Sequence, residues 1–200
     1  MDENQISYEE IDKEIEERAH KRRQKLPHDI FDFVEFFVIA FAVILLAFTF
    51  LVRQTVVTGA SMRPTLENED RLIISNLFYT PKAGDIVVIQ IDDDIAAKRP
   101  TVLERDSSII KRVIATEGQT VSIQNGSVYV DGALLDADFS YLSDNDSMAE
   151  ITVSEGHIFV LGDNRSVSLD SRVLGEIDKR TVIGKVLFRL APFSEFGGIK

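Results

Sequence analysis

The stretch VSIQNGSVYV, residues 121–130, indicates the class of fold more clearly than any other part of this chain. Two short runs rich in valine and isoleucine flank Asn125-Gly126, and an Asn-Gly pair favours the type I′ turn of a β-hairpin. Short β-branched runs between turn residues recur at 85–91, 157–161 and 181–190. Helical periodicity is weak from residue 53 onward. The sequence therefore predicts a mostly β, antiparallel domain over residues 53–193.

The apolar run before this domain has a different character. Residues 36–52 are seventeen uncharged residues, which reach about 26 Å as a helix against a hydrocarbon core of ~30 Å. We expect a transmembrane anchor here; the alternative, a buried core helix, would normally show a polar face. Residues 18–35 contain five Lys or Arg and residues 53–70 contain two. The positive-inside rule then places the N-terminus in the cytoplasm and residues 53–200 outside.

A removable signal peptide is the main alternative to an anchor. Thr58-Gly59-Ala60 has small residues at the two positions that a cleavage site needs, so the cut would precede Ser61. However, the apolar run exceeds the usual core of about 7–15 residues, and a negatively charged segment precedes it. We therefore expect it to be retained.

These features divide the chain into four parts. Residues 7–25 are expected to form a charged helix that Pro27 interrupts, and polar excursions are expected at 92–108 and 136–150. The expected parts are a cytoplasmic segment (1–35), the anchor (36–52), an extracytoplasmic β domain (53–193) with a smaller β subdomain inserted at 119–157, and a C-terminal tail (194–200).

Composition excludes several classes of function. The chain has no cysteine, so it can form neither disulfides nor a thiolate metal site. Its net charge is −11, with acid in excess both before and after residue 52. Nucleic-acid binding needs a basic face, so no nucleic-acid partner is expected.

Ser61 and Lys111 are the candidate reactive residues. Ser61 lies in TGASMRPTL (58–66), where Gly59 permits close backbone approach and Pro64 stiffens the turn. A serine nucleophile needs a base, and His157, the only histidine after residue 52, fits a structural role at the start of a strand. Lys111 has apolar neighbours, and burial lowers a lysine pKa toward operating pH. On the pattern alone, a solvent-facing lysine on an edge strand remains the plainer interpretation of Lys111, and a surface hydroxyl is the alternative for Ser61.

A third segment is dense in short polar side chains. GDNRSVSLDSR, residues 162–172, follows a predicted strand. Its hydroxyls, carboxylates and guanidinium groups suit either an ordinary capped turn or a hydrogen-bonded support for a catalytic site.

Four segments, in this order along the chain, resemble the type I signal peptidases, the membrane-bound serine–lysine proteases of bacteria. They are SMRPTL (61–66), GDIVV (84–88), KRVI (111–114), and GDNR (162–165) with Ser168, Asp170, Ser171 and Arg172. A match to one such segment is weak evidence for the family, but four matches in the same order are specific to it. The single anchor and short chain are similar to the Gram-positive members. The resemblance implies the signal peptidase fold, an antiparallel β-sheet catalytic domain with one N-terminal transmembrane helix.

The resemblance also implies a role for each matching residue. Ser61 would be the nucleophile and Lys111, neutral at rest, its general base. Ser168 would orient the Lys111 amine by a hydrogen bond, while Asp170 and Arg172 would form an ion pair that braces the loop.

The implied oxyanion site and substrate pockets involve further residues. The Ser61 backbone N–H would donate to the oxyanion, and Gly59 stands where some relatives place a serine as second donor. Shallow apolar pockets would favour small side chains, as in Ala-x-Ala. Their expected lining is Met62, Leu66 and Ile109 for S1, and Val57 with Ile110 for S3.

The function implied by the resemblance is removal of signal peptides from exported pre-proteins, without metal or cofactor, at the plasma membrane. The expected partners are pre-proteins as substrates, the lipid bilayer and, as a further contact that the resemblance allows, the secretion machinery. Two alternatives stay open. One is a non-catalytic scaffold for surface fibre assembly, whose members lack the serine or the lysine that this chain has. The other is an anchored β domain that only binds.

Overall fold

The structure, a computed structural model, describes residues 8–51, 53–99, 107–135 and 146–199, apart from the side chains of 8–10, 19–30 and 47–51. Val52 of the expected anchor, and residues 100–106 and 136–145 of the two polar excursions, lie outside these ranges. So do residues 1–7 and 200. The chain forms two compact units, which divide between Phe50 and Leu51.

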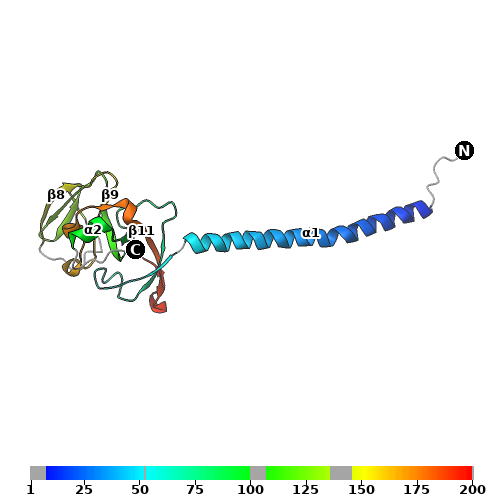
Figure 1. Cartoon of the computed structure of the whole chain (residues 1–200), viewed down its shortest axis with the longest axis horizontal. Helices are drawn as coiled ribbons and strands as arrows, with labels where there is room; N and C mark the ends of the chain where they lie inside the picture. The colour runs from blue at the N-terminus through cyan, green and yellow to red at the C-terminus, as the bar shows by residue number, and fades with distance from the viewer. Residues whose placement is uncertain (1–7, 52, 100–106, 136–145, 200) are drawn as a thin grey trace. The chain divides into compact units, whose positions relative to one another are not determined.

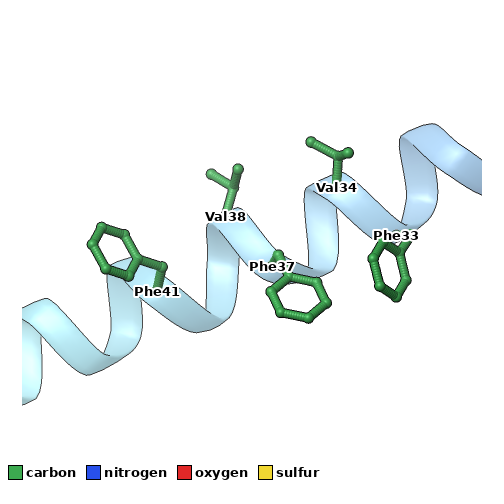
Figure 2. A pocket seen from close by; sticks show the side chains of 5 residues that line it. All are labelled: Phe33, Val34, Phe37, Val38 and Phe41. Atoms are coloured by element: carbon green, nitrogen blue, oxygen red, sulfur yellow. The ribbon is translucent and has the colours of Figure 1, made fainter.

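The first unit is a single helix, α1 (Tyr8–Leu51), of 44 residues (Figure 1). It runs on through Pro27, so the predicted interruption there is wrong. Proline removes one backbone hydrogen bond, and the helix-forming residues on both sides continue the turn. Phe33, Phe37 and Phe41 recur every fourth residue on the exposed surface of α1 (Figure 2). Within the residues whose side chains are described, no helix combines the length and apolar character needed to cross a membrane.

The second unit contains a large antiparallel sheet, which confirms the predicted class of fold. Its strand order is β1-β2-β11-β3-β4-β9-β10, with β12 beside β11. Residues rich in valine and isoleucine form the central strands, as the pattern predicted. The strands are β1 (Arg53–Val56), β2 (Arg71–Ser75), β3 (Ile86–Gln90), β4 (Ser108–Thr116), β9 (His157–Leu161), β10 (Ile177–Asp178), β11 (Val182–Ala191) and β12 (Gly197–Gly198).

A smaller antiparallel sheet lies between β4 and β9 in the sequence, inside the expected insertion at 119–157. Its order is β7-β6-β5-β8. The Asn125-Gly126 hairpin is confirmed, since Gln124 pairs with Ser127 and both turn residues have positive φ. The strands are β5 (Thr120–Gln124), β6 (Ser127–Val130), β7 (Ala133–Leu134) and β8 (Met148–Thr152).

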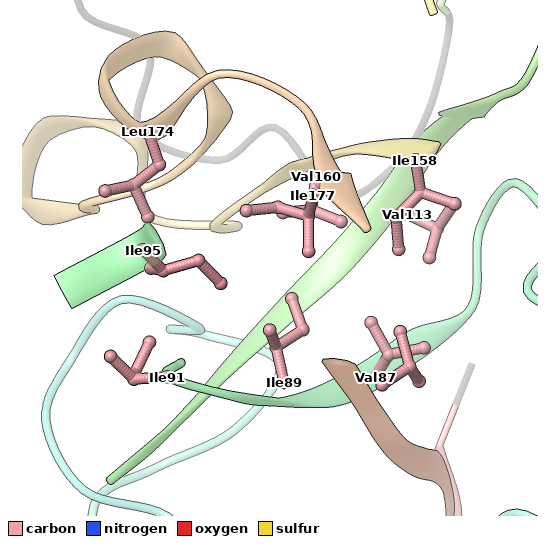
Figure 3. Packing of buried hydrophobic residues seen from close by; sticks show 10 residues of the cluster. Val87, Ile89, Ile91, Ile95, Val113, Ile158, Val160, Leu174 and Ile177 are labelled. Carbon is pink, nitrogen blue, oxygen red and sulfur yellow. The ribbon is translucent and has the colours of Figure 1, made fainter. Parts of the chain in front are cut away.

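Short helices cover one face of the large sheet. Ile95 from α2 (Asp93–Lys98) and Leu174 from α3 (Ser171–Leu174) pack over Ile89 and Val160 of the strands (Figure 3). A second apolar cluster contains Leu72, Ile74 and Val186, and a third joins the smaller sheet to β4 and β9. The described residues of the unit also form three short 3₁₀ helices: η1 (Arg165–Val167), η2 (Lys179–Thr181) and η3 (Phe193–Glu195).

The last residues belong to the large sheet. Gly197 and Gly198 of β12 pair with Arg189 and Phe188 of β11, and Ile199 packs against the second cluster. The segment expected as a tail at 194–200 therefore contains, in its described part, the end of a 3₁₀ helix, a two-residue strand and a core contact at Ile199.

Candidate active site

Ser61 lies in the connection between β1 and β2, which we call the serine segment (residues 58–70). Gly59 adopts φ +94°, a left-handed conformation that favours glycine. Its N–H donates to Asn68 Oδ1 at 2.9 Å, which ties the start of the segment to its end. The Leu66 N–H donates to the Met62 carbonyl at 2.9 Å and closes a tight turn directly after Ser61. These contacts fix the backbone on both sides of the serine.

Lys111 lies on β4, and the structure brings its amine to the serine. Lys111 Nζ is 2.9 Å from Ser61 Oγ and also donates to the Ile110 carbonyl at 2.9 Å. The lysine is only 3% exposed. Burial lowers the pKa of Lys111 to about 8, while the carboxylates of Asp170 and Asp163 act in the opposite direction. An amine in this state can accept a proton near neutral pH.

The support loop (residues 162–172) follows β9 and holds the serine by its backbone. The Asn164 N–H donates to the Ser61 carbonyl at 3.0 Å. A Cβ built on Gly162 would lie 2.2 Å from Ser168 Oγ and 2.6 Å from the Ser61 carbonyl oxygen. Glycine at 162 is therefore required by the close approach of the serine segment.

Asp170 and Arg172 form an ion pair within this loop. Arg172 Nε lies 2.9 Å from Asp170 Oδ1, and the Asp170 side chain is fully buried. Asp170 also accepts from the Gly162 N–H at 3.1 Å. The Arg172 guanidinium reaches the carbonyl of Arg165 at 2.6 Å and Asp146 Oδ2 at 3.0 Å. Together these contacts fix the path of the loop beside Ser61.

Ser168 is close to the site, but its expected bond to Lys111 is not present. Its Oγ is buried and has no hydrogen-bond partner among the described residues. It contacts the backbone at Gly162 instead, which in turn lies against the Ser61 carbonyl.

A second buried ion pair, which had no predicted role, joins three segments. Arg112 donates to Asp163 in a bidentate manner at 2.9 and 2.8 Å, and both side chains are 1% exposed. Thr65 Oγ1 donates to Asp163 Oδ2 at 2.5 Å, and Arg112 Nη1 donates to the Gly84 carbonyl at 2.8 Å. The pair thus links the strand of Lys111, the support loop and the serine segment. A charge within the apolar run 109–114 was the available signal, because a buried arginine needs a partner.

The expected pocket residues are divided between two faces of the sheet. Val57, Met62, Leu66 and Ile110 all belong to the second apolar cluster, and Met62 and Leu66 are at most 1% exposed. Ile109 packs against the first cluster instead, because neighbouring residues of a strand point to opposite faces. The structure therefore does not bring Ile109 together with Met62 and Leu66.

The arrangement can support nucleophilic catalysis by a hydroxyl. A buried amine with a lowered pKa contacts Ser61 Oγ, and two loops hold the serine backbone. Among the described residues, no group of three or more His, Asp or Glu side chains has the placement of a metal site.

Comparisons with known proteins find similarity over most of the chain. The sequence model of a family described as signal peptidase, peptidase S26, matches residues 30–191. The chain is 35% identical to the probable signal peptidase I-1 of a Synechocystis strain, over 80% of this chain and 81% of the relative. It is 34% identical to signal peptidase I of Bacillus licheniformis, over 90% of this chain and 96% of the relative. A crystal structure of a signal peptidase I from Enterococcus faecalis is 27% identical, covers 54% of this chain and 97% of its own, and has a TM-score of 0.41.

Proposed function

This chain belongs to the signal peptidase family, peptidase S26, and is a serine endopeptidase of the bacterial type I class. On that premise, we propose that it cleaves N-terminal signal peptides from exported pre-proteins. In this proposal Ser61 is the nucleophile and Lys111 is the general base. The observation that carries the proposal is the 2.9 Å distance between Lys111 Nζ and Ser61 Oγ.

The acylation step follows from this contact. With Lys111 neutral, the Ser61 hydroxyl donates its hydrogen bond to Nζ. As Oγ attacks the scissile carbonyl, the proton moves to Nζ, and the resulting ammonium then protonates the leaving amine. The new N-terminus of the mature protein departs, and the signal peptide remains as an ester on Ser61.

Deacylation uses the same pair in reverse. Lys111, neutral again, accepts a proton from a water that attacks the ester, and the proton returns to Ser61 Oγ. The Ser61 backbone N–H is the proposed donor to the oxyanion in both steps. The Asn164 bond to the Ser61 carbonyl supports this assignment, because it fixes the orientation of the serine residue.

The supporting roles are proposals of the same kind. Asp170 and Arg172 hold the support loop, and Gly59 keeps the left-handed turn before the nucleophile. Ser168 is proposed to orient the Lys111 amine when substrate is bound. The support for this role is the buried Ser168 hydroxyl, which has no hydrogen-bond partner among the described residues. Buried polar groups without a partner are rare in folded proteins and often have a functional role.

The proposed specificity is for small residues at the P1 and P3 positions. Val57, Met62, Leu66 and Ile110 form one apolar cluster next to Ser61, and each is at most 9% exposed. Alanine side chains fit such a surface, whereas larger ones would need the cluster to move. Ile109 packs on the opposite face of the sheet and is not included in this pocket.

We further propose that residues 36–52 anchor the enzyme in the plasma membrane, with the catalytic domain outside. The support is the uncharged run and the excess of Lys and Arg before it. Anchoring raises the local concentration of pre-proteins that emerge from the bilayer or from the secretion machinery.

The test is turnover of a pre-protein with an Ala-x-Ala site by the purified full chain in detergent. We expect one cut directly after the P1 alanine, identified by N-terminal sequencing of the product. Pre-proteins with a large residue at P1 or P3 should remain uncut. Binding without turnover would instead support the scaffold or the binding-only alternative.

A further inference from the structure

Arg189 of β11 is a buried cation close to the serine segment but remote in sequence. The residue is 8% exposed. Its Nη2 donates to the Thr65 carbonyl, its Nε lies 3.2 Å from Asp70 Oδ2, and its Nη1 pairs with Glu195. The contact with Asp70 is an ion pair and not a hydrogen bond, because Nε has no hydrogen-bond partner among the described residues. A guanidinium suits this site, since its planar group reaches a carbonyl and two carboxylates at once.

The residues that Arg189 contacts control the path of the serine segment. Thr65 is four residues after Ser61, and its hydroxyl already donates to Asp163. Thr65 is therefore held by Asp163 through its side chain and by Arg189 through its carbonyl. Asp70 accepts from the Glu67 N–H at 2.9 Å and closes the segment. The two buried ion pairs, Arg112–Asp163 and Arg189–Asp70, thus both contact Thr65, the first at its hydroxyl and the second at its carbonyl.

The C-terminal segment (residues 193–199) completes the surroundings of Arg189. Gly197 pairs with Arg189 itself across β11 and β12. Glu195 adds a carboxylate that is 54% exposed. Ile199 packs against the cluster that contains Met62 and Leu66. The C-terminal segment therefore contacts both Arg189 and the apolar side of the serine segment.

We propose that Arg189 is a positioning residue for Ser61, and that the C-terminal segment braces it; this rests on the proposed function above. Arg189 touches neither reacting atom. It acts by fixing the Thr65 carbonyl and Asp70, so that Ser61 Oγ stays within hydrogen-bond distance of Lys111. A displacement of about 1 Å in such a contact can lower a rate by roughly 100-fold.

The test compares variants of the full-length enzyme in detergent. Arg189→Met should lower kcat roughly 10- to 100-fold with little change in KM. Looser packing admits water to Lys111, so its pKa should rise and the midpoint of the kcat/KM pH profile should move upward. Arg189→Lys should recover part of kcat. Asp70→Asn, which keeps an acceptor for Glu67, should lower kcat less, and Glu195→Gln least, because its carboxylate is half exposed.

Arg180→Met is the matched control, since Arg180 pairs with Asp178 at a site where its side chain is 90% exposed. It should keep the parental kcat and pH profile. A folded Arg189→Met with parental kcat overturns the proposal. The proposal is also overturned if the loss of activity is explained by a lower thermal unfolding temperature alone and the midpoint of the pH profile stays at its parental value. If Arg189→Met does not fold, Asp70→Asn and Glu195→Gln decide by the same criteria. Cleavage by Ser61→Ala would refute the proposed function instead, so the two failures are distinct.

Discussion

Lys111 Nζ lies 2.9 Å from Ser61 Oγ across fifty positions of sequence, and the lysine is only 3% exposed. A buried amine beside a hydroxyl is a means of activating a serine without histidine. The contact exists because β4 and the serine segment are joined by the Arg112–Asp163 ion pair and by the Asn164 bond to the Ser61 carbonyl.

The rate of cleavage should rise with pH through about 8. Lys111 must be neutral to accept the Ser61 proton, and burial lowers its pKa to about 8. We therefore expect log kcat/KM to increase with a slope near one below this pH and to level off above it. The measurement is the initial rate on an Ala-x-Ala peptide from pH 6 to 10. A profile that is flat between pH 6 and 9 would argue against a lysine base.

Lys111→Met should stabilise the fold at neutral pH while abolishing activity. The folded-state pKa lies below the unfolded value of 10.5. The ammonium is therefore penalised in the folded state at every pH below about 8, and the penalty vanishes above the unfolded pKa. At pH 7 the free energy of unfolding of Lys111→Met should exceed that of the parent by about 1–3 kcal/mol.

Urea unfolding of the parent and of Lys111→Met, at pH 7 and at pH 10.5, measures this effect. The difference between the two proteins should shrink at the higher pH. A variant that is less stable than the parent at pH 7 would show that burial of the lysine carries no such cost.

Gly162→Ala should impair both the fold and the site. The new methyl group would overlap Ser168 Oγ and the Ser61 carbonyl oxygen. Overpacking of this kind costs about 1–3 kcal/mol, and kcat should fall because Ser61 is displaced. Adding Ser168→Gly relieves only one of the two overlaps, so the double variant should recover part of the stability. Full activity in Gly162→Ala would contradict the close approach.

Thr65→Val should separate positioning from stability. The change keeps the shape of the side chain but removes the 2.5 Å hydrogen bond to Asp163. We expect a loss of about 1–2 kcal/mol in unfolding free energy and a clear fall in kcat at constant KM. Thr181→Val is the control, because Thr181 donates a comparable bond to the Asp178 carbonyl outside the serine segment. Equal kcat losses in the two variants would refute a specific role for Thr65.

Local patterns in the sequence were enough to predict the class of fold. The Asn125-Gly126 turn and the β-branched runs identified β3, β5, β6, β9 and β11, because both depend on local backbone preferences. The short helix α2 and the strand β8 were missed, since they lie wholly or partly in segments expected as polar excursions. The continuous helix through Pro27 was not predicted, because the break was inferred from the proline alone. The helix-forming residues on both sides of Pro27 continue the helix. The strand at residues 197–198 was also missed, because two glycines carry no β signal and pair only through the edge of β11.

The site shows the same division between local and long-range information. Ser61 and Lys111 could be proposed from their neighbours and from the resemblance, but their distance depends on the packing of β4, the serine segment and the support loop. Arg112 was visible as a charge in an apolar run, yet Asp163 could be chosen as its partner only in three dimensions. Ile109 was assigned to the pocket of Met62 and Leu66, although strand alternation turns it to the other face.

The most direct test of the central claim is single-turnover cleavage of one pre-protein by the parent, Ser61→Ala and Lys111→Ala, each shown to be folded by its thermal transition. We expect complete processing by the parent. Both variants should fall to background, at least about 1,000-fold slower, because the nucleophile and its base act as one unit. Cleavage by either folded variant within about tenfold of the parental rate would contradict the serine–lysine assignment.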